Sequence, residues 1–186
     1  MTSGLLLIDF QTGFSLPGWG DRNNPEAESN AARLLSAWRT QGKPVFHVRH
    51  ISTTPDSPLH ANQGGTDFIP TLLPLAAEPS FDKHVNSAFI GTSLEQTLRD
   101  QDVKELVICG LTTPHCVSTS CRMAANLGFQ VILAHDACAA FTGNADISWA
   151  TLAPMSAEEI HISAVSHLHG EFVDAQGCDS ILRRTP

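Results

Sequence analysis

Short apolar runs recur along the chain, and polar segments with helical spacing separate them. Runs of three or four residues rich in Leu, Ile and Val are typical of strands that are buried on both faces of a parallel sheet. We expect strands at Leu5–Ile8, Val45–Val48, Leu106–Cys109, Val131–Ala134 and Ile160–Ile162, with a weaker candidate at Phe81–Lys83.

Three of the intervening segments place apolar residues on one face of a helix. In the first of them, Ala31, Leu34, Leu35 and Trp38 recur at positions i, i+3, i+4 and i+7. The predicted helices are Asn30–Gln41, Ser93–Asp100 with Ser93 as its N-cap, and Pro114–Leu127 with Thr113 as its N-cap. Alternating strands and helices predict an α/β fold. Right-handed crossovers make it a three-layer α/β/α sandwich around a mostly parallel, doubly wound, Rossmann-like sheet.

Composition and charge exclude several classes of protein. The chain has 186 residues, 42% of them hydrophobic, which suits a single domain over residues 1–186 with a sizeable core. The formal net charge of −8 and the scattered basic residues disfavour a nucleic-acid partner. No apolar run approaches the roughly 20 residues that cross a bilayer, so we expect no membrane partner. The five cysteines form no Cys-x-x-Cys pair, which favours a reducing, cytoplasmic setting.

Reactive side chains follow three of the predicted strands. In doubly wound sheets, sites form beyond the carboxyl ends of the strands, where the strand order reverses. The first strand ends in Asp9, the weak candidate strand ends in Lys83, and the central strand runs into Gly110–Cys116. With Thr113 as N-cap, Cys116 lies in the first turn of a helix, whose positive end favours a thiolate and whose N–H groups can bind an oxyanion. The set predicts a nucleophilic cysteine, with an Asp to accept its proton and a Lys to stabilise the charged forms.

Three segments together resemble the isochorismatase-like cysteine hydrolase superfamily, in its amidase branch. They are Leu5–Gln11 (LLLIDFQ), Phe81–Phe89 (FDKHVNSAF) and Gly110–Val117 (GLTTPHCV), within a similarity that extends over roughly residues 4 to 165. The resemblance implies a six-stranded parallel sheet, a catalytic triad of Asp9, Lys83 and Cys116, and a homo-oligomer. It also implies a cis peptide bond between Leu111 and Thr112, which would aim the amides of Thr112 and Cys116 at a substrate oxygen.

The presence of Cys116 places the resemblance on the amidase side of the superfamily. Isochorismatases proper cleave a vinyl ether and lack the cysteine, whereas nicotinamidases, N-carbamoylsarcosine amidases and ureido hydrolases have it. Nicotinamidases also hold a metal through an Asp-x-His pattern after the second strand, and the corresponding stretch here is Phe46–Ser52 (FHVRHIS). We therefore expect neither a metal nor another cofactor, with His50, Asp56 and His60 as an alternative ligand set.

Further residues near the predicted strand ends are candidates for the walls of a substrate pocket. The proline-rich connection over residues 51–79 is long enough to close over the site or to contact another subunit. Each candidate also has a simpler interpretation as ordinary packing, and free cysteines such as Cys116 are often just small buried apolar residues. The substrate-binding candidates are Gln11, Phe14, His50, His115 and Phe141.

The sequence thus predicts a cysteine-dependent hydrolase that cleaves the C–N bond of a small carboxamide or ureido compound through a thioester. Two alternatives stay open on the same fold: a redox-active or sensing thiol protein, and a metal-assisted amidase of the nicotinamidase type. A third alternative is a binding module that has lost the chemistry, although an intact Asp–Lys–Cys set argues against it.

Overall fold

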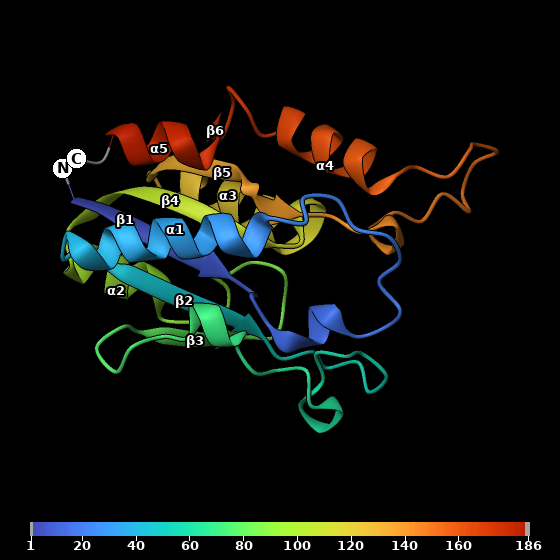
Figure 1. The fold of residues 1–186 in the computed structure, drawn as a ribbon, viewed down its shortest axis with the longest axis horizontal. Helices are drawn as coiled ribbons and strands as arrows, with labels where there is room; N and C mark the ends of the chain where they lie inside the picture. The colour runs from blue at the N-terminus through green and yellow to red at the C-terminus, as the bar shows by residue number, and fades with distance from the viewer. Residues whose placement is uncertain (1, 185–186) are drawn as a thin grey trace.

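The predicted apolar runs form the centre of one parallel sheet. The computed structural model describes residues 2–184, and its six strands run in the order β3-β2-β1-β4-β5-β6 (Figure 1). Leu5–Ile8 of the central strand are at most 2% exposed, because helices cover both faces of the sheet. The strands are β1 (Thr2–Ile8), β2 (Val45–His50), β3 (Ser80–Lys83), β4 (Val103–Leu111), β5 (Gln130–Ala139) and β6 (Asp174–Gln176).

Helices lie in front of and behind this sheet, which confirms the three-layer arrangement. Helix α1 crosses the front face in Figure 1 and contacts α5, whereas α2 and α3 lie behind the sheet. None of the helices within residues 2–184 has both the length and the apolar character needed to cross a bilayer. The helices are α1 (Ala27–Thr40), α2 (Leu94–Asp100), α3 (Ser118–Asn126), α4 (Ala157–Ser166) and α5 (Cys178–Arg184).

The predicted strand at Ile160–Ile162 is wrong, because these residues lie inside α4. A capping box starts that helix: Ser156 Oγ accepts a hydrogen bond from the Glu159 N–H, and the Glu159 carboxylate accepts one from the Ser156 N–H. The sixth strand is instead β6, a three-residue edge strand of polar composition. An edge strand of this kind has no apolar pattern that the sequence analysis could have detected.

Of the two predicted N-caps, Ser93 is confirmed in position and Thr113 is wrong. Ser93 occupies the N-cap position of α2, but its hydroxyl makes no capping hydrogen bond. Thr113 lies inside a π-helical turn, η4 (Thr113–Val117), which precedes α3, so the predicted helix Pro114–Leu127 is divided into two elements. The Thr113 hydroxyl is instead 2.9 Å from Nδ1 of His161 in α4, which ties the turn to that helix.

The sheet reverses its direction of growth between β1 and β4. From β1 the chain adds β2 and β3 on one side, and β4, β5 and β6 then follow on the other. The ends of β1 and β4 are in register, with Ile8 opposite Gly110. Such a switch point leaves a crevice beyond the carboxyl ends of the two central strands. The segments after β1 and β4 therefore meet there.

Gly110 allows this close approach of β1 and β4. Its φ is +148°, and a Cβ atom at this position would lie 2.1 Å from the carbonyl oxygen of Ile8. We expect Gly110→Ala to lower the free energy of unfolding by at least about 3 kcal/mol, because overpacking adds to an unfavourable φ. Urea titration followed by circular dichroism measures this loss.

Gly42→Ala is the matched control, because Gly42 also has a positive φ (+62°) but a Cβ there meets no atom within 4 Å. It should lose only about 1–2 kcal/mol, the value for a left-handed residue alone. Equal losses of unfolding free energy in the two variants would show that close contact with Ile8 does not add to the cost at position 110.

Candidate active site

Asp9 is the first residue after β1 and turns the chain sharply. Its φ is +55°, a left-handed conformation that Asp adopts more readily than most residues. Its N–H donates to the Val48 carbonyl at 2.8 Å, so the backbone is still held to β2 while the side chain is buried at the switch point. Asp9 is fully buried, which means that its carboxylate depends on protein partners for stabilisation.

Lys83 is the last residue of β3, two strands away from β1, and its side chain is also fully buried. Its Nζ lies 2.7 Å from Asp9 Oδ2, 3.1 Å from Cys116 Sγ and 3.0 Å from His50 Nδ1. An ammonium group has three protons to donate, and these three acceptors satisfy all of them. The carboxylate of Asp9 thus compensates the buried positive charge, and His50 and Cys116 accept the remaining hydrogen bonds of the ammonium.

Cys116 lies in the turn η4, which follows the Leu111–Thr112 peptide bond at the end of β4. That peptide bond is cis, the geometry that the family resemblance implies. The Cys116 side chain is buried, with 9% of the residue exposed, and its sulfur lies at one side of a small cavity. The structure therefore brings together the three side chains predicted for the triad, each from a different strand end.

Burial governs the protonation of the cluster. It raises the pKa of Asp9, and Lys83 opposes this shift. Burial, and next the negative charge of Asp9, raise the pKa of the Cys116 thiol to about 12. The expectation of a resting thiolate is therefore wrong: the thiol is protonated at neutral pH, beside a carboxylate whose burial makes it a stronger base.

His50, at the end of β2, is a neutral member of the cluster. Its Nδ1 faces the Lys83 ammonium, so that nitrogen accepts a hydrogen bond and carries no proton. Burial and the charge of Lys83 lower the pKa of His50 to about 4, which agrees with that assignment. Gln11 fixes this residue from the backbone: its side chain donates to the His50 carbonyl at 3.0 Å and accepts from the His50 N–H at 2.7 Å.

The cavity over Cys116 has a volume of about 130 Å³. Of the predicted pocket residues, Phe14, His50 and His115 line it, together with Thr112 of the predicted oxyanion site. Ser57 and Leu59 also line it but lie in the proline-rich connection, where the sequence carries no signal for them. The full lining is Phe14, Trp19, His50, Ser57, Leu59, Asn86, Thr112, His115 and Cys116.

Three further predicted residues do not line the cavity. Gln11 is used to brace His50, as described above, and its amide also donates to the Thr66 carbonyl. Phe141 stacks behind Phe14, with ring centroids 6.0 Å apart, and so supports the wall from the second layer. Leu111 is buried at the end of β4, and only its peptide bond to Thr112 belongs to the site.

The donor atoms near the cavity do not suit a metal ion. Within residues 2–184, the one group of potential ligands that gathers within 4.8 Å is Asp9, His50 and Cys116. The Lys83 ammonium lies within hydrogen-bond distance of all three, so a cation already occupies the position between them. Within the same residues, the ligand atoms of the alternative set of His50, Asp56 and His60 do not gather within that distance, and His60 Nδ1 accepts a hydrogen bond from the Asn62 N–H.

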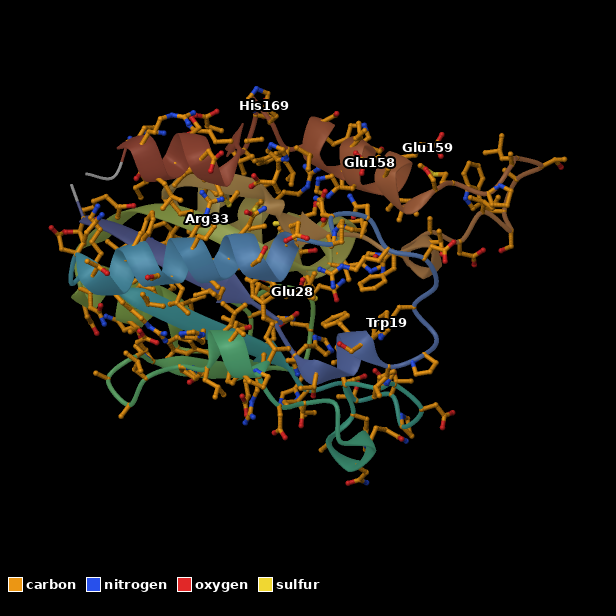
Figure 2. The ribbon with its side chains drawn as sticks, viewed as in Figure 1. Trp19, Glu28, Arg33, Glu158, Glu159 and His169 are labelled. Atoms are coloured by element: carbon orange, nitrogen blue, oxygen red, sulfur yellow. The ribbon has the colours of Figure 1, made fainter. Side chains whose placement is uncertain are left out.

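A larger hollow of about 530 Å³ lies beside α4, away from this cluster. Its lining includes Glu158 and His169, both labelled in Figure 2, and also His135 and His161. No cysteine lines it, and its histidines face no carboxylate–ammonium pair. The smaller cavity over Cys116 is therefore the better candidate for chemistry.

Comparison with known proteins assigns the chain to a family. The model of the isochorismatase domain matches residues 3–162. The chain belongs to the isochorismatase family. The isochorismatase family protein YrdC of Bacillus subtilis is 39% identical over 178 residues, which are 96% of this chain and 93% of that protein. The crystal structure of an isochorismatase-family hydrolase from Chromobacterium violaceum superposes with a TM-score of 0.90 at 42% identity, covering 98% of this chain and 92% of that one.

Members of the isochorismatase family that resemble this chain include amide hydrolases. The maleamate amidohydrolase of Pseudomonas putida is 30% identical over 155 residues, which are 71% of this chain and 70% of that enzyme. This isochorismatase-family hydrolase thus has relatives that act on amides, and its sheet is the α/β fold of its structural neighbours.

The raised pKa of Cys116 predicts how its thiol responds to alkylation. Because the pKa is about 12, the rate of iodoacetamide labelling at Cys116 should rise about tenfold per pH unit between pH 7 and pH 10. Asp9→Asn removes a negative charge that raises this pKa, so the variant should label faster than the wild type at pH 8. Mass spectrometry of the Cys116 peptide measures both rates.

Asp82→Asn is the control for this experiment, because Asp82 is an exposed carboxylate of β3 that pairs with Arg49 of the adjacent strand β2. It should label like the wild type. Slower labelling of Asp9→Asn, or a plateau near pH 7, would contradict the assignment of a protonated resting thiol.

Proposed function

We propose that this protein hydrolyses the C–N bond of a small carboxamide or ureido compound through a thioester on Cys116. The observation that carries the proposal is the buried contact of Lys83 with both Asp9 and Cys116, at distances of 2.7 and 3.1 Å, beside a small cavity. In this arrangement the thiol can act as the nucleophile and the carboxylate as its base. The ammonium can stabilise the charges that form on both.

In the first step, Asp9 accepts the proton of the Cys116 thiol while the sulfur attacks the carbonyl carbon of the substrate. The C=O π electrons move to the oxygen, which becomes an oxyanion. We assign its binding to the N–H groups of Thr112 and Cys116, both at the cavity wall. Removal of one such donor typically raises the barrier by about 2.7–4 kcal/mol. Lys83 stabilises the sulfur and the carboxylate as charge moves between them.

In the second step, the tetrahedral intermediate collapses and the C–N bond breaks. Asp9 returns the proton to the leaving nitrogen, so that ammonia or an amine departs and the acyl group remains on sulfur as a thioester. Asp9 then accepts a proton from a water molecule that attacks the thioester. Expulsion of the Cys116 sulfur, which takes the proton back, releases the acid and restores the enzyme.

The protonated resting thiol favours hydrolysis over a redox or sensing role. Thiols that react readily with peroxide have a lowered pKa, whereas burial raises the pKa of Cys116. The other four cysteines are also buried. A high thiol pKa does not prevent acyl transfer when a general base lies beside the thiol, because the proton then leaves only as the sulfur attacks.

We also propose that the protein works as a homo-oligomer in the cytoplasm. The segment of residues 145–156 projects from the body in Figure 1, between the short helical turn Thr142–Asn144 and α4, and it exposes Trp149 (79%) and Leu152 (61%). Exposed apolar groups of this size suit a contact between subunits. Five cysteines without a disulfide suit a reducing compartment.

Sedimentation equilibrium tests the oligomer. The wild type should sediment as a multiple of the 20.0 kDa chain, and Trp149→Ser with Leu152→Ser should shift the mass toward the monomer. Ile90→Ser, which alters a 51% exposed side chain elsewhere, should leave the mass unchanged. A wild type that sediments as a monomer would contradict the proposal.

Loss of the nucleophile tests the proposed reaction. Ammonia release from a panel of small amides and ureido compounds should fall at least about 10³-fold in Cys116→Ala, because no other group at the cavity can form the thioester. Lys83→Met should fall by a similar factor while keeping the aliphatic volume of the side chain.

Cys121→Ala is the matched control, since Cys121 is a buried cysteine of α3 that does not line the cavity. It should retain the wild-type rate. Equal ammonia release by the wild type and Cys116→Ala would remove Cys116 as the nucleophile.

A further inference from the structure

We propose that the cavity over Cys116 selects small, uncharged amides and excludes amides that carry a carboxylate. This inference rests on the proposed function of Cys116 and specifies its substrate class. It is carried by three features of the cavity: its size, the absence of a charge-pairing group in its lining, and its apolar wall.

The cavity is too small for a large substrate. Its volume of about 130 Å³ is well below the roughly 300–1,000 Å³ of sites for drug-sized ligands. On the same measure a water molecule needs about 10–15 Å³, so the cavity suits a molecule of roughly ten non-hydrogen atoms. In a substrate of that size, a charged group near the amide lies close to the lining of the cavity.

No side chain that lines the cavity can pair with a carboxylate. The nine lining residues include neither Arg nor Lys. The buried ammonium of Lys83 is already compensated by Asp9 at 2.7 Å, and its remaining protons face His50 and Cys116. A second carboxylate brought close to Asp9 would face a like charge in a site of low dielectric, where repulsion is strong.

The two histidines of the lining do not supply a positive charge. His50 Nδ1 faces the Lys83 ammonium at 3.0 Å, which leaves no room for a proton on that nitrogen. His115 is half-buried, and burial lowers its pKa. Both imidazoles are therefore neutral at physiological pH, and each offers a substrate only a dipole.

The guanidinium group of Arg22 is kept out of the cavity. It lies over the ring of Phe141, at 5.6 Å from the ring centroid, and Phe141 in turn stacks on Phe14. Both of its terminal nitrogens are paired with the carboxylate of Glu28, at 2.7 and 2.6 Å. Two aromatic layers and an ion pair thus separate this cation from the substrate.

An apolar wall completes the cavity. Phe14 and Trp19 contact each other with ring centroids 4.7 Å apart, and Leu59 adds an aliphatic surface. The Trp19 indole N–H donates to the Gly13 carbonyl at 2.9 Å, which fixes the ring (Trp19 is labelled in Figure 2). Burying an ionised carboxylate against such a wall without a partner is strongly unfavourable, whereas a neutral amide needs only hydrogen bonds.

This selection would separate the chain from one of its relatives. Maleamate, the substrate named for the Pseudomonas putida enzyme, carries a carboxylate next to its amide. Maleamide has the same carbon skeleton with a second, neutral amide in that place. The two compounds therefore test the charge preference with almost no change in size.

A pair of alkylating agents tests the preference without any need for turnover. Iodoacetamide and iodoacetate have nearly the same size and differ in charge. The ratio of their labelling rates at Cys116 should exceed, by at least tenfold, the same ratio for the small neutral thiol N-acetylcysteine amide. A ratio equal to or below that of the free thiol would overturn the inference.

Ser57→Arg then places a cation at the lip of the cavity, and Ser57→Gln is its neutral control. Both variants lose the hydrogen bond from the Leu59 N–H to the Ser57 hydroxyl, so they share any effect on the turn. Ser57→Arg should reduce the rate ratio at least threefold and Ser57→Gln should leave it unchanged. An identical change in the two variants would contradict an electrostatic origin.

Turnover of maleamide and maleamate by the wild type and Cys116→Ala separates the two proposals. Turnover of maleamide that depends on Cys116 and exceeds that of maleamate at least tenfold supports both. Equal turnover of the two compounds, with dependence on Cys116, overturns the charge preference and leaves the reaction standing. A charge-dependent labelling ratio with no Cys116-dependent turnover of any amide overturns the reaction and leaves the preference standing.

Discussion

The site depends on one buried ammonium group whose three protons all have an acceptor. Lys83 lies at the end of β3, Asp9 follows β1, and Cys116 lies in the turn after β4. The Lys83 ammonium contacts both Asp9 and Cys116. A lysine in the interior is normally deprotonated or absent, because desolvation opposes its charge. Here the carboxylate compensates the charge, while the sulfur and the neutral ring of His50 satisfy the remaining donors. The fold is arranged so that these partners arrive from separate strand ends at one point.

The same burial explains why the chemistry is divided between two residues. Burial, and next the negative charge of Asp9, disfavour the ionised form of a cysteine in this position. The carboxylate that disfavours the thiolate is also the group best placed to accept its proton, and desolvation strengthens it as a base. In the proposed reaction, the thiol therefore loses its proton only as the sulfur attacks the substrate.

The strand ends were predictable from the sequence, and the surroundings of the cysteine were not. Apolar runs located β1, β2, β4 and β5, and the topology rule for parallel sheets then brought Asp9 and Cys116 to one edge. Lys83 follows from the weakest of the predicted strands, since a four-residue edge strand has little pattern of its own, and the family resemblance of its segment adds support. Ile160 and Ile162 are two residues apart, which is the period of a strand, whereas the capping box of Ser156 and Glu159 is the local signal of a helix there. Ser57 and Leu59 come from a connection whose path depends on tertiary contacts such as those of Gln11, which no local pattern encodes.

The position of Lys83 on an outer strand has a consequence for the durability of the enzyme. β3 is four residues long and has a neighbour on one side only, so it belongs to the part of the sheet that opens most easily. Fraying of that strand would withdraw the ammonium while the inner strands, with Asp9 and Cys116, stay folded. Heat inactivation would then begin as a local event at the sheet margin, and amide hydrogens of residues 80–83 would exchange before those of β1 and β4. The candidate site would therefore lose one of its charged groups when the edge of the sheet opens, although its cavity lies beyond the ends of the central strands.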